Sequence, residues 1–307
     1  MSFMLTANTA KQATSRRQVL RAAGLLMTAS LGGCNWLTEG VFDGADAPDE
    51  RASGSSYPVA WVLSSGGPRG FVHVGVLQAL DELGCKPDLV VGSSVGALVG
   101  CLYAAGLGVR MLATLALESS ITSFIQPTLV GDEWLSAGGV GQMVNTLIEN
   151  KPLHQLPTAF AAVAVDKASR QPRAFNWGNA GAAVQAACAI EGRLASVTIR
   201  GKRYVDSDFV TPMPVRIARA MGAVRVLAVD ASAYEDKAPA GAEQFRAGDL
   251  RKRALTAPDA QAADLTLHPD IGYYASISRE YRARCIRAGY EQTLAQAPVL
   301  LALHRRS

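Results

Sequence analysis

The sequence predicts an α/β fold, in which a mainly parallel sheet is covered by helices on both faces. Two observations lead to this prediction. Short apolar runs alternate along the chain with segments of helical periodicity, which is the order of strands and helices in a parallel sheet. Glycine-rich turns follow the first two apolar runs, at 66–70 and 92–96. Turns at the carboxyl ends of such strands are where these sheets place ligands.

The first part of the folded chain consists of two strand–turn–helix units. Residues 59–63 form a buried apolar strand that ends at glycines, and a helix with apolar residues along one face follows over 69–83 until Gly84 stops it. The second strand covers 88–91, and a helix over 95–105 leaves its glycine turn. Further helical segments are expected at 109–118 and at 134–149, with a glycine-rich break at Gly138-Gly139.

The second part of the chain adds strands and helices of the same kind. Strands are expected at 160–165 and 224–229 and in a hairpin of 197–199 with 203–205, which turns at Gly201. Helices are expected at 179–189, 214–221 and 276–296. The stretch 235–261 is polar and mixed in charge and has no apolar period, which predicts a mobile excursion.

The first 33 residues have the pattern of an export signal. Arg16 and Arg17 form a twin-arginine pattern before an apolar run over 22–33, which is shorter than the roughly 20 residues of a membrane-spanning helix. The run ends in Leu-Gly-Gly-Cys34, which resembles a bacterial lipobox, in which the cysteine is acylated. We expect a signal peptide over 1–33 and an exported, membrane-anchored lipoprotein facing the periplasm or the cell exterior. The alternative is a plain secretory signal in which Cys34 is incidental.

Composition and charge limit the partners of the mature chain. Residues 34–57 are polar without an apolar period, which predicts a flexible tether ahead of a catalytic domain over 58–303. Four of the 30 basic residues and none of the 26 acidic ones precede Cys34. The remainder is therefore balanced and gives no case for a nucleic-acid partner. The other cysteines lack the spacing of a disulfide framework, and Cys101, in an apolar helical stretch, is expected to be a buried free thiol.

A strand-to-helix turn carries the candidate nucleophile. Gly92-Ser93-Ser94-Val95-Gly96 is a G-x-S-x-G pattern, which presents a serine hydroxyl on a strained elbow. Glycines stand both two residues before and two residues after Ser94 but not Ser93. Ser94 is therefore the expected nucleophile, and Gly92 and Gly96 allow the tight turn.

The motifs together resemble those of a known family. The stretch 63–77 contains Ser65-Gly66-Gly67-Pro68-Arg69-Gly70 and His73-Val74-Gly75-Val76-Leu77, the elbow follows at 92–96, and Tyr204-Val205-Asp206-Ser207-Asp208 precedes Pro212-Met213-Pro214-Val215. This set resembles the patatin-like phospholipases over roughly 59–301. The resemblance implies a three-layer α/β hydrolase that acts on a lipid ester beside a membrane surface.

The resemblance also implies a serine–aspartate pair in place of a triad. Ser94 would attack an ester carbonyl and form an acyl-enzyme, and Asp206 would accept and return the proton. Neither a metal nor a cofactor is implied. None of the four histidines has a sequence setting that marks it as the base; His73 is expected to pack within its helix or to be solvated.

The first glycine turn is the candidate oxyanion hole. Gly66, Gly67, Arg69 and Gly70 can offer backbone N–H groups to a tetrahedral oxyanion, whereas Pro68 cannot. The helix that opens at Arg69 adds positive potential at its N-terminus. The alternative is a phosphate cradle, but neither a G-x-G-x-x-G nor a Walker pattern is present.

The sequence departs from the family pattern in three segments. Ser65 replaces the first of three glycines, Glu191 replaces a usual proline, and the D-G-G segment reads Asp206-Ser207-Asp208. If the missing glycine supports an unusual backbone conformation, Ser207 strains or rotates Asp206. A like charge at Asp208 raises the pKa of either acid, and Asp208 is itself an alternative acid.

These departures leave three functions open. The first is lipolytic acyl hydrolysis, the second is acyl transfer, and the third is a degenerate protein that binds a lipid or a partner without turnover. Asp166 and Asp230 also end strand patterns and are expected to be structural. Residues 135–148 are either an amphipathic flap over an acyl pocket or part of the core. A basic cluster, either solvated or in contact with anionic headgroups, comprises Arg246, Arg251, Lys252 and Arg253.

Overall fold

The computed structural model describes residues 40–52, 54–120, 124–129 and 131–305. The predicted signal peptide over 1–33 and the candidate acylation site at Cys34 lie outside the described residues. Within the described ranges, no helix is long and apolar enough to cross a membrane.

A nine-stranded sheet forms the centre of the described residues, in the order β1-β8-β9-β6-β3-β2-β10-β11, with β7 paired to β6. Its central strands from β6 to β11 are all parallel, whereas β7 and the β8–β9 hairpin add antiparallel pairs. The strands are β1 (Val41–Phe42), β2 (Tyr57–Leu63), β3 (Leu89–Ser93), β6 (Ala159–Asp166), β7 (Pro172–Phe175), β8 (Val197–Ile199), β9 (Lys202–Asp206), β10 (Ala223–Val229) and β11 (Leu265–Leu267). A separate short hairpin pairs β4 (Gln126–Pro127) with β5 (Leu135–Ser136).

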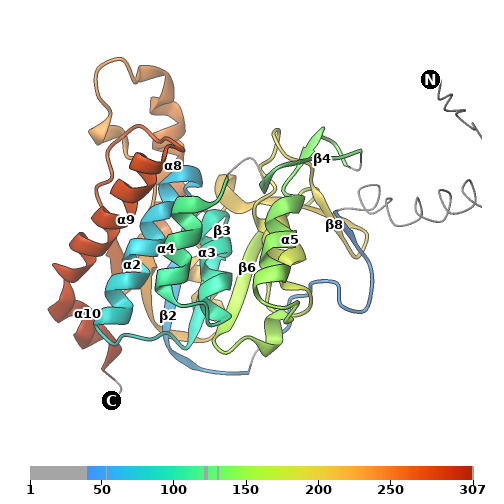
Figure 1. The fold of residues 1–307 in the computed structure, drawn as a ribbon, viewed down its shortest axis with the longest axis horizontal. Helices are drawn as coiled ribbons and strands as arrows, with labels where there is room; N and C mark the ends of the chain where they lie inside the picture. The colour runs from blue at the N-terminus through green and yellow to red at the C-terminus, as the bar shows by residue number, and fades with distance from the viewer. Residues whose placement is uncertain (1–39, 53, 121–123, 130, 306–307) are drawn as a thin grey trace, which may run out of the picture. The chain divides into compact units, whose positions relative to one another are not determined.

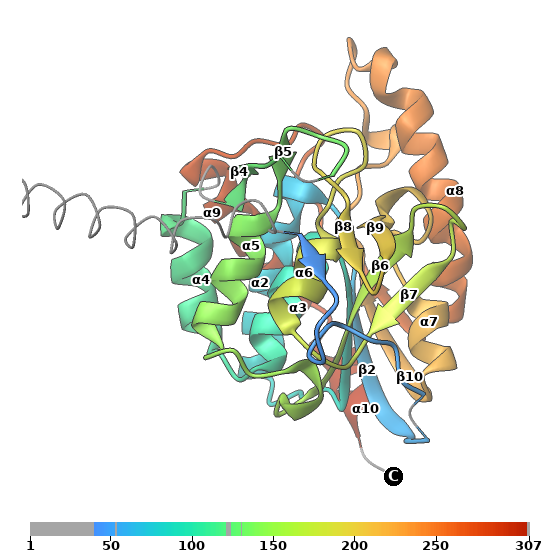
Figure 2. The ribbon, with the colours of Figure 1, turned by 90° about the vertical axis from the view of Figure 1, so that its right-hand side faces the viewer.

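Helices cover both faces of the sheet, as the sequence predicts. Helices α2 to α6 and α9 lie on one face, and α7 and α8 lie on the other (Figures 1 and 2). The helices are α2 (Phe71–Glu82), α3 (Val95–Ala104), α4 (Val109–Glu118), α5 (Gly138–Leu147), α6 (Ala180–Ala187), α7 (Val215–Ala220), α8 (Arg246–Ala262), α9 (Arg279–Leu294) and α10 (Ala297–His304).

Strand β2 illustrates why the sheet is buried on both sides. Successive side chains of a strand point to opposite faces. Trp61 and Leu63 pack into the core under the larger helical layer, whereas Ala60 and Val62 pack with the residues under α7. All four side chains are at most 1% exposed, which accounts for the continuous apolar run in the sequence.

The prediction of a mobile excursion over 235–261 is wrong for its second half, which forms α8. The sequence shows no apolar helical periodicity there, because α8 is held to the rest of the protein by ionic contacts instead of a broad apolar face. The buried carboxylate of Asp259 accepts hydrogen bonds from the backbone N–H and the guanidinium of Arg216 on α7. A second contact, through Lys252, reaches Asp208.

The prediction of a flexible tether over 34–57 is also wrong for residues 41–49. Strand β1 pairs with β8, Ala47 is 1% exposed in the main core, and Asp49 bridges Trp177. The segment has no apolar period because backbone hydrogen bonds at the sheet edge hold it in place.

Helices α2 and α9 approach each other through glycines. A Cβ atom at Gly75 would lie 1.8 Å from the carbonyl oxygen of Ile286, and one at Gly289 would lie 2.3 Å from that of Val72. Both obstacles are backbone atoms, which cannot move aside as a side chain can. This contact fixes the position of α2, the helix that follows the first glycine turn.

We therefore expect Gly75→Ala to lower the free energy of unfolding by about 2–3 kcal/mol, because the added methyl group forces the two helices apart. Urea denaturation measures the loss. Gly248→Ala in α8 is the matched control, since a Cβ there meets no atom within 4 Å, and alanine in a helix is favoured by roughly 0.5–1 kcal/mol. Equal stability of Gly75→Ala and the unsubstituted protein would contradict the proposed contact.

Candidate active site

Ser94 occupies a strained turn between β3 and α3. Its φ of 53° and ψ of −127° lie in a region that side chains rarely adopt. The turn requires both neighbouring glycines. A Cβ at Gly96 would lie 2.2 Å from the carbonyl oxygen of Leu63, and one at Gly92 would lie 2.5 Å from the Cα atom of Ala97. The observed elbow therefore matches the G-x-S-x-G prediction.

The structure brings Ser94 and Asp206 together. The Ser94 hydroxyl donates a hydrogen bond of 2.5 Å to Oδ2 of Asp206, and the two residues are 8% and 4% exposed. Asp206 ends β9, which lies beside β6 with Ala164 opposite Asp206. On the other side of β6, Ala162 lies opposite Gly92 of β3. The two side chains therefore meet over the end of β6.

Burial sets the protonation behaviour of Asp206. Loss of hydration raises the pKa of its carboxyl group to about 7, and the negative charge of Asp208 acts in the same direction. The hydrogen bonds from Ser94 and from the Asp208 N–H, together with the charge of Lys252, act against this rise. Asp206 is thus a carboxyl group that exchanges its proton near neutral pH, within hydrogen-bond reach of a serine.

Asp208, the alternative acid, points to other partners. Its Oδ1 accepts hydrogen bonds from the Ser65 hydroxyl and the Lys252 ammonium group. Burial raises the pKa of Asp208, but the charge and hydrogen bond of Lys252 and the hydrogen bond of Ser65 outweigh it and leave the pKa lowered. Asp208 is therefore held as a carboxylate beside the site, whereas Asp206 makes the contact with Ser94.

Ser207 does not strain the turn, contrary to the expectation from its missing glycine. It is not among the described residues with a positive φ, and it begins a short 3₁₀ helix, η6 (Ser207–Phe209). Its buried hydroxyl donates to the carbonyl oxygen of Val163 at 3.1 Å and lies 2.7 Å from the Ser93 hydroxyl. Ser207 thereby ties the Asp206 turn to β3 and β6.

The first glycine turn lies beside Ser94, but its four predicted donors are not equivalent. Gly67 lines the same cavity as Ser94. The Arg69 N–H donates to the carbonyl oxygen of Gly66 at 3.1 Å, so the prediction that it serves an oxyanion is wrong. Gly70 lies inside a 3₁₀ helix, η3 (Gly67–Gly70), and packs against Val95. Within the described residues, the N–H groups of Gly66 and Gly67 donate no hydrogen bond, which leaves them for a ligand.

A buried network that the sequence did not reveal holds this turn. The Ser64 N–H donates to Val229 of β10, and the Ser65 N–H donates to Pro212. The fully buried ring of His73 contacts the Ser64 carbonyl oxygen at 2.9 Å through Nε2. Burial lowers the pKa of His73 to about 4, so the ring is neutral at physiological pH and donates this bond.

Each of the four histidines has a partner other than Ser94. His154 stacks on Trp177, and His268 stacks on Tyr234. His304 accepts a hydrogen bond of 2.8 Å from the Trp61 indole. Together with His73 under the glycine turn, these placements leave Asp206 as the titratable group bonded to the Ser94 hydroxyl.

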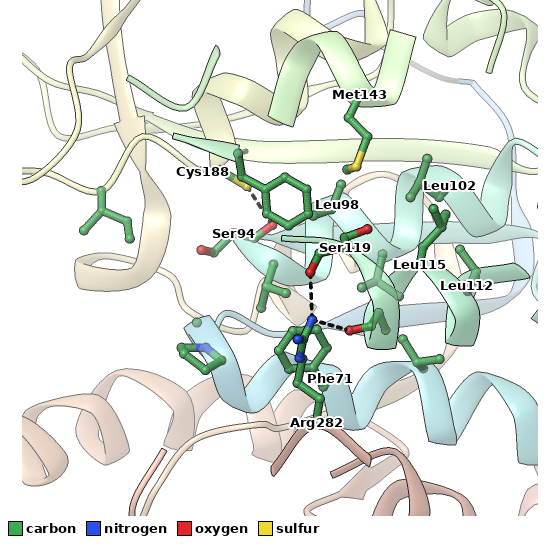
Figure 3. Close-up of a pocket in the computed structure, with 18 residues that line it drawn as sticks. Phe71, Ser94, Leu98, Leu102, Leu112, Leu115, Ser119, Met143, Cys188 and Arg282 are labelled. Atoms are coloured by element: carbon green, nitrogen blue, oxygen red, sulfur yellow. Dashed lines mark hydrogen bonds between the residues drawn. The ribbon is translucent and has the colours of Figure 1, made fainter. Parts of the chain in front are cut away.

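An apolar cavity of about 260 Å³ opens at Ser94 (Figure 3). Its walls come mainly from α2, α3 and α4. The labelled lining residues are Phe71, Ser94, Leu98, Leu102, Leu112, Leu115, Ser119, Met143, Cys188 and Arg282. Arg282 of α9 closes one side by donating hydrogen bonds of 2.9 Å to the carbonyl oxygens of Ala116 and Ser119. The cavity suits an apolar ligand beside Ser94.

The remaining candidate residues are mostly structural. In 135–148, Met143 lines the cavity while Val140 and Val144 are buried in the core, so core packing dominates over a flap. Of the basic cluster, Lys252 and Arg253 bind acidic side chains.

The three acidic candidates outside the site also have local partners. Glu191 forms an ion pair with Arg170. Asp166 accepts hydrogen bonds from the N–H groups of Ala168 and Ser169, and Asp230 accepts hydrogen bonds from the Ser232 N–H and the Tyr234 hydroxyl. Cys101 is a buried free thiol, as expected.

The chain is similar in sequence to known proteins over more than half of its length. A family model described as patatin-like phospholipase matches residues 61–219. An uncharacterized NTE family protein of Mycobacterium tuberculosis is 32% identical over 188 residues, which cover 60% of this chain and 52% of that protein. Human patatin-like phospholipase domain-containing protein 6 is 29% identical over 186 residues, 58% of this chain and 14% of that protein.

The matched segment is thus about half of the mycobacterial relative and a small part of the human one. Among solved structures, VipD from Legionella pneumophila has a TM-score of 0.48 and 12% identity, with 84% of this chain and 70% of that chain covered.

The raised pKa of Asp206 predicts a variant with increased stability. Because the carboxyl group holds its proton more tightly in the folded state, the unsubstituted protein loses stability as the pH rises from about 4 to about 7. Asp206→Asn removes this loss. We expect it to raise the free energy of unfolding at pH 8 by as much as about 4 kcal/mol, with the gain shrinking toward pH 4. Urea unfolding at several pH values measures both, and a gain independent of pH would contradict the assignment.

Proposed function

The chain belongs to the patatin-like phospholipase family, and from this premise we propose that it is a serine acyl hydrolase of lipids. The proposed substrates are ester-linked fatty acids of phospholipids, cleaved in the manner of a phospholipase A or a lysophospholipase. The single observation that carries the proposal is the buried hydrogen bond between Oδ2 of Asp206 and Oγ of Ser94, a residue that lines an apolar cavity.

The proposed reaction begins with acylation of Ser94. As its Oγ attacks the ester carbonyl carbon, Asp206 takes the hydroxyl proton, and the negative charge moves to the carbonyl oxygen. The N–H groups of Gly66 and Gly67, which donate no hydrogen bond within the described residues, would stabilise that charge from the glycine turn. The tetrahedral intermediate then collapses, the bond to the alcohol breaks, and the departing oxygen takes the proton from Asp206. The acyl group is left on Ser94, with its chain in the cavity.

Deacylation reverses these roles with water. Asp206 accepts a proton from a water molecule that attacks the acyl carbonyl, and Ser94 leaves with that proton as the fatty acid is released. An alcohol in place of water would give acyl transfer through the same acyl-enzyme. A carboxyl group whose pKa is near 7 is suited to both proton transfers at neutral pH.

We expect hydrolysis to depend on both members of the pair. Ser94→Ala removes the nucleophile and should reduce fatty-acid release from a lysophospholipid to the blank. Asp206→Asn retains the shape but not the base, and should lower kcat by about 100- to 10,000-fold. Because the ionised form of Asp206 is required, kcat/KM should rise through a midpoint near pH 7 and stay level above it. Steady-state rates from pH 5 to 9 test both expectations.

The control for these variants is Asp166→Asn. Asp166 is another carboxylate at a strand end, and its oxygen binds the N–H groups of Ala168 and Ser169 instead of a serine hydroxyl near the cavity. Its activity should be that of the unsubstituted protein. Release by Ser94→Ala equal to that of the unsubstituted protein would refute the proposed chemistry. Absence of release and of labelling by a serine-reactive probe in the unsubstituted protein would favour a binding protein.

We also propose that the enzyme acts at a membrane surface outside the cytoplasm. Support comes from the twin-arginine pattern at Arg16-Arg17 and the lipobox-like sequence that ends at Cys34. Expression of the full chain should give a mature form that begins at Cys34 and carries lipid on it. Mass spectrometry of the N-terminal peptide decides this, with Cys34→Ala as the variant expected to remain unlipidated. An unmodified N-terminal peptide would rule out the anchor.

A further inference from the structure

Helix α8 places one lysine against the active site. Nζ of Lys252 donates a hydrogen bond of 2.8 Å to the Ser65 hydroxyl and also bonds Oδ1 of Asp208. The Ser65 hydroxyl donates to the same oxygen of Asp208. The side chains of Lys252 and Asp208 are 17% and 30% exposed. The glycine turn, the Asp206 turn and α8 therefore meet at a single carboxylate oxygen.

We propose that Lys252 is a positioning residue for the proposed ester hydrolysis, and that it joins the turn carrying the proposed oxyanion donors to the turn carrying the proposed base. The inference rests on the proposed function and assigns a role to a helix outside the core of the site. Ser65 directly precedes Gly66, and Asp208 stands two residues after Asp206. Lys252 holds both turns through side-chain hydrogen bonds, and it acts on Asp206 through its charge and not through a hydrogen bond.

The geometry of α8 makes Lys252 a firm anchor. Asp259 lies two helical turns after Lys252, so the two side chains share one face of the helix. Asp259 is fully buried and binds Arg216 of α7. One helical face is thus fixed to the body at both points, and the ammonium group does not rely on a flexible loop for its position.

The charge of Lys252 also limits the rise in the pKa of Asp206 and so favours its ionised form. The titratable groups that face Asp206 are Asp208 from its own turn, Lys252 from α8 and Cys188 from the end of α6. Asp208 alone would add a full negative charge beside Asp206. With the ammonium group bonded to Asp208, the pair is close to neutral, and the repulsion that reaches Asp206 is reduced.

A double-mutant cycle tests this role, with variants Lys252→Met, Asp208→Asn and the combination of both. Two quantities are measured. The first is the pH midpoint of the rise in kcat/KM, and the second is the pKa of the Asp206 carboxyl group from a ¹³C NMR titration, in which the Asp206→Asn variant identifies the signal. Lys252→Met leaves Asp208 uncompensated and should raise the midpoint by about one pH unit or more. Asp208→Asn removes the repulsion and should lower the midpoint below that of the unsubstituted protein. The double variant should fall between the two single variants.

Conservative and remote variants separate positioning from general stability. Lys252→Arg keeps the charge and should keep the midpoint, and Lys237→Met removes an exposed lysine of the segment before α8 as the matched control. Urea unfolding establishes that each variant is folded at the pH of measurement. A common midpoint in all variants, with only stability changed, would overturn the proposal. If Ser94→Ala retains full hydrolysis, the proposed function fails, whereas the NMR titration still decides the role of Lys252.

Discussion

The hydrogen bond between Ser94 and Asp206 depends on one strand placed between the two residues. β6 pairs with β3 in parallel and with β9 in antiparallel orientation, with Ala162 opposite Gly92 and Ala164 opposite Asp206. Adjacent strands lie about 4.8 Å apart, so β3 and β9 are about 10 Å apart. Only the turns after β3 and β9, which converge over the end of β6, bring the two side chains within 2.5 Å. A one-residue slip in either register would turn one of them to the other face.

The same arrangement is costly to the fold. A serine at positive φ stores strain, and a buried carboxyl group loses its hydration. Both are tolerated because the surrounding sheet is apolar on both faces, as the alternate packing of Trp61 and Val62 demonstrates. Glycines at 92 and 96 permit the backbone contacts of the elbow, and the hydroxyl of Ser207 pins the acidic turn to Val163. Apolar burial in the sheet therefore offsets the backbone strain at Ser94 and the lost hydration of Asp206.

Local sequence signals predicted most of this architecture but few of its long-range polar contacts. The apolar run 59–63 and the glycines around Ser94 identify β2 and the elbow because burial and backbone crowding act on adjacent residues. Asp206 was identified only through resemblance to a family. Helix α8 escaped prediction because it is fixed by contacts such as Arg216–Asp259, 43 residues apart. The periodicity of apolar residues cannot predict a contact between two polar residues so far apart in the sequence, and this applies to Lys252 and Asp208 as well.

Asp206, and not a histidine, contacts the Ser94 hydroxyl. Its buried position gives the carboxyl group a pKa close to that of an imidazole. An imidazole has a pKa near 6.5 in water, whereas a carboxyl group reaches that range only when it loses its hydration or lies beside another negative charge. The pKa of Asp206 reaches about 7 mainly because the packing around it excludes water, and the charge of Asp208 adds to the rise. The same packing provides the apolar walls beside Ser94 that suit an acyl chain. Base strength and accommodation of the proposed substrate are thus two results of one dry environment, and a polar substitution in that environment would weaken both together.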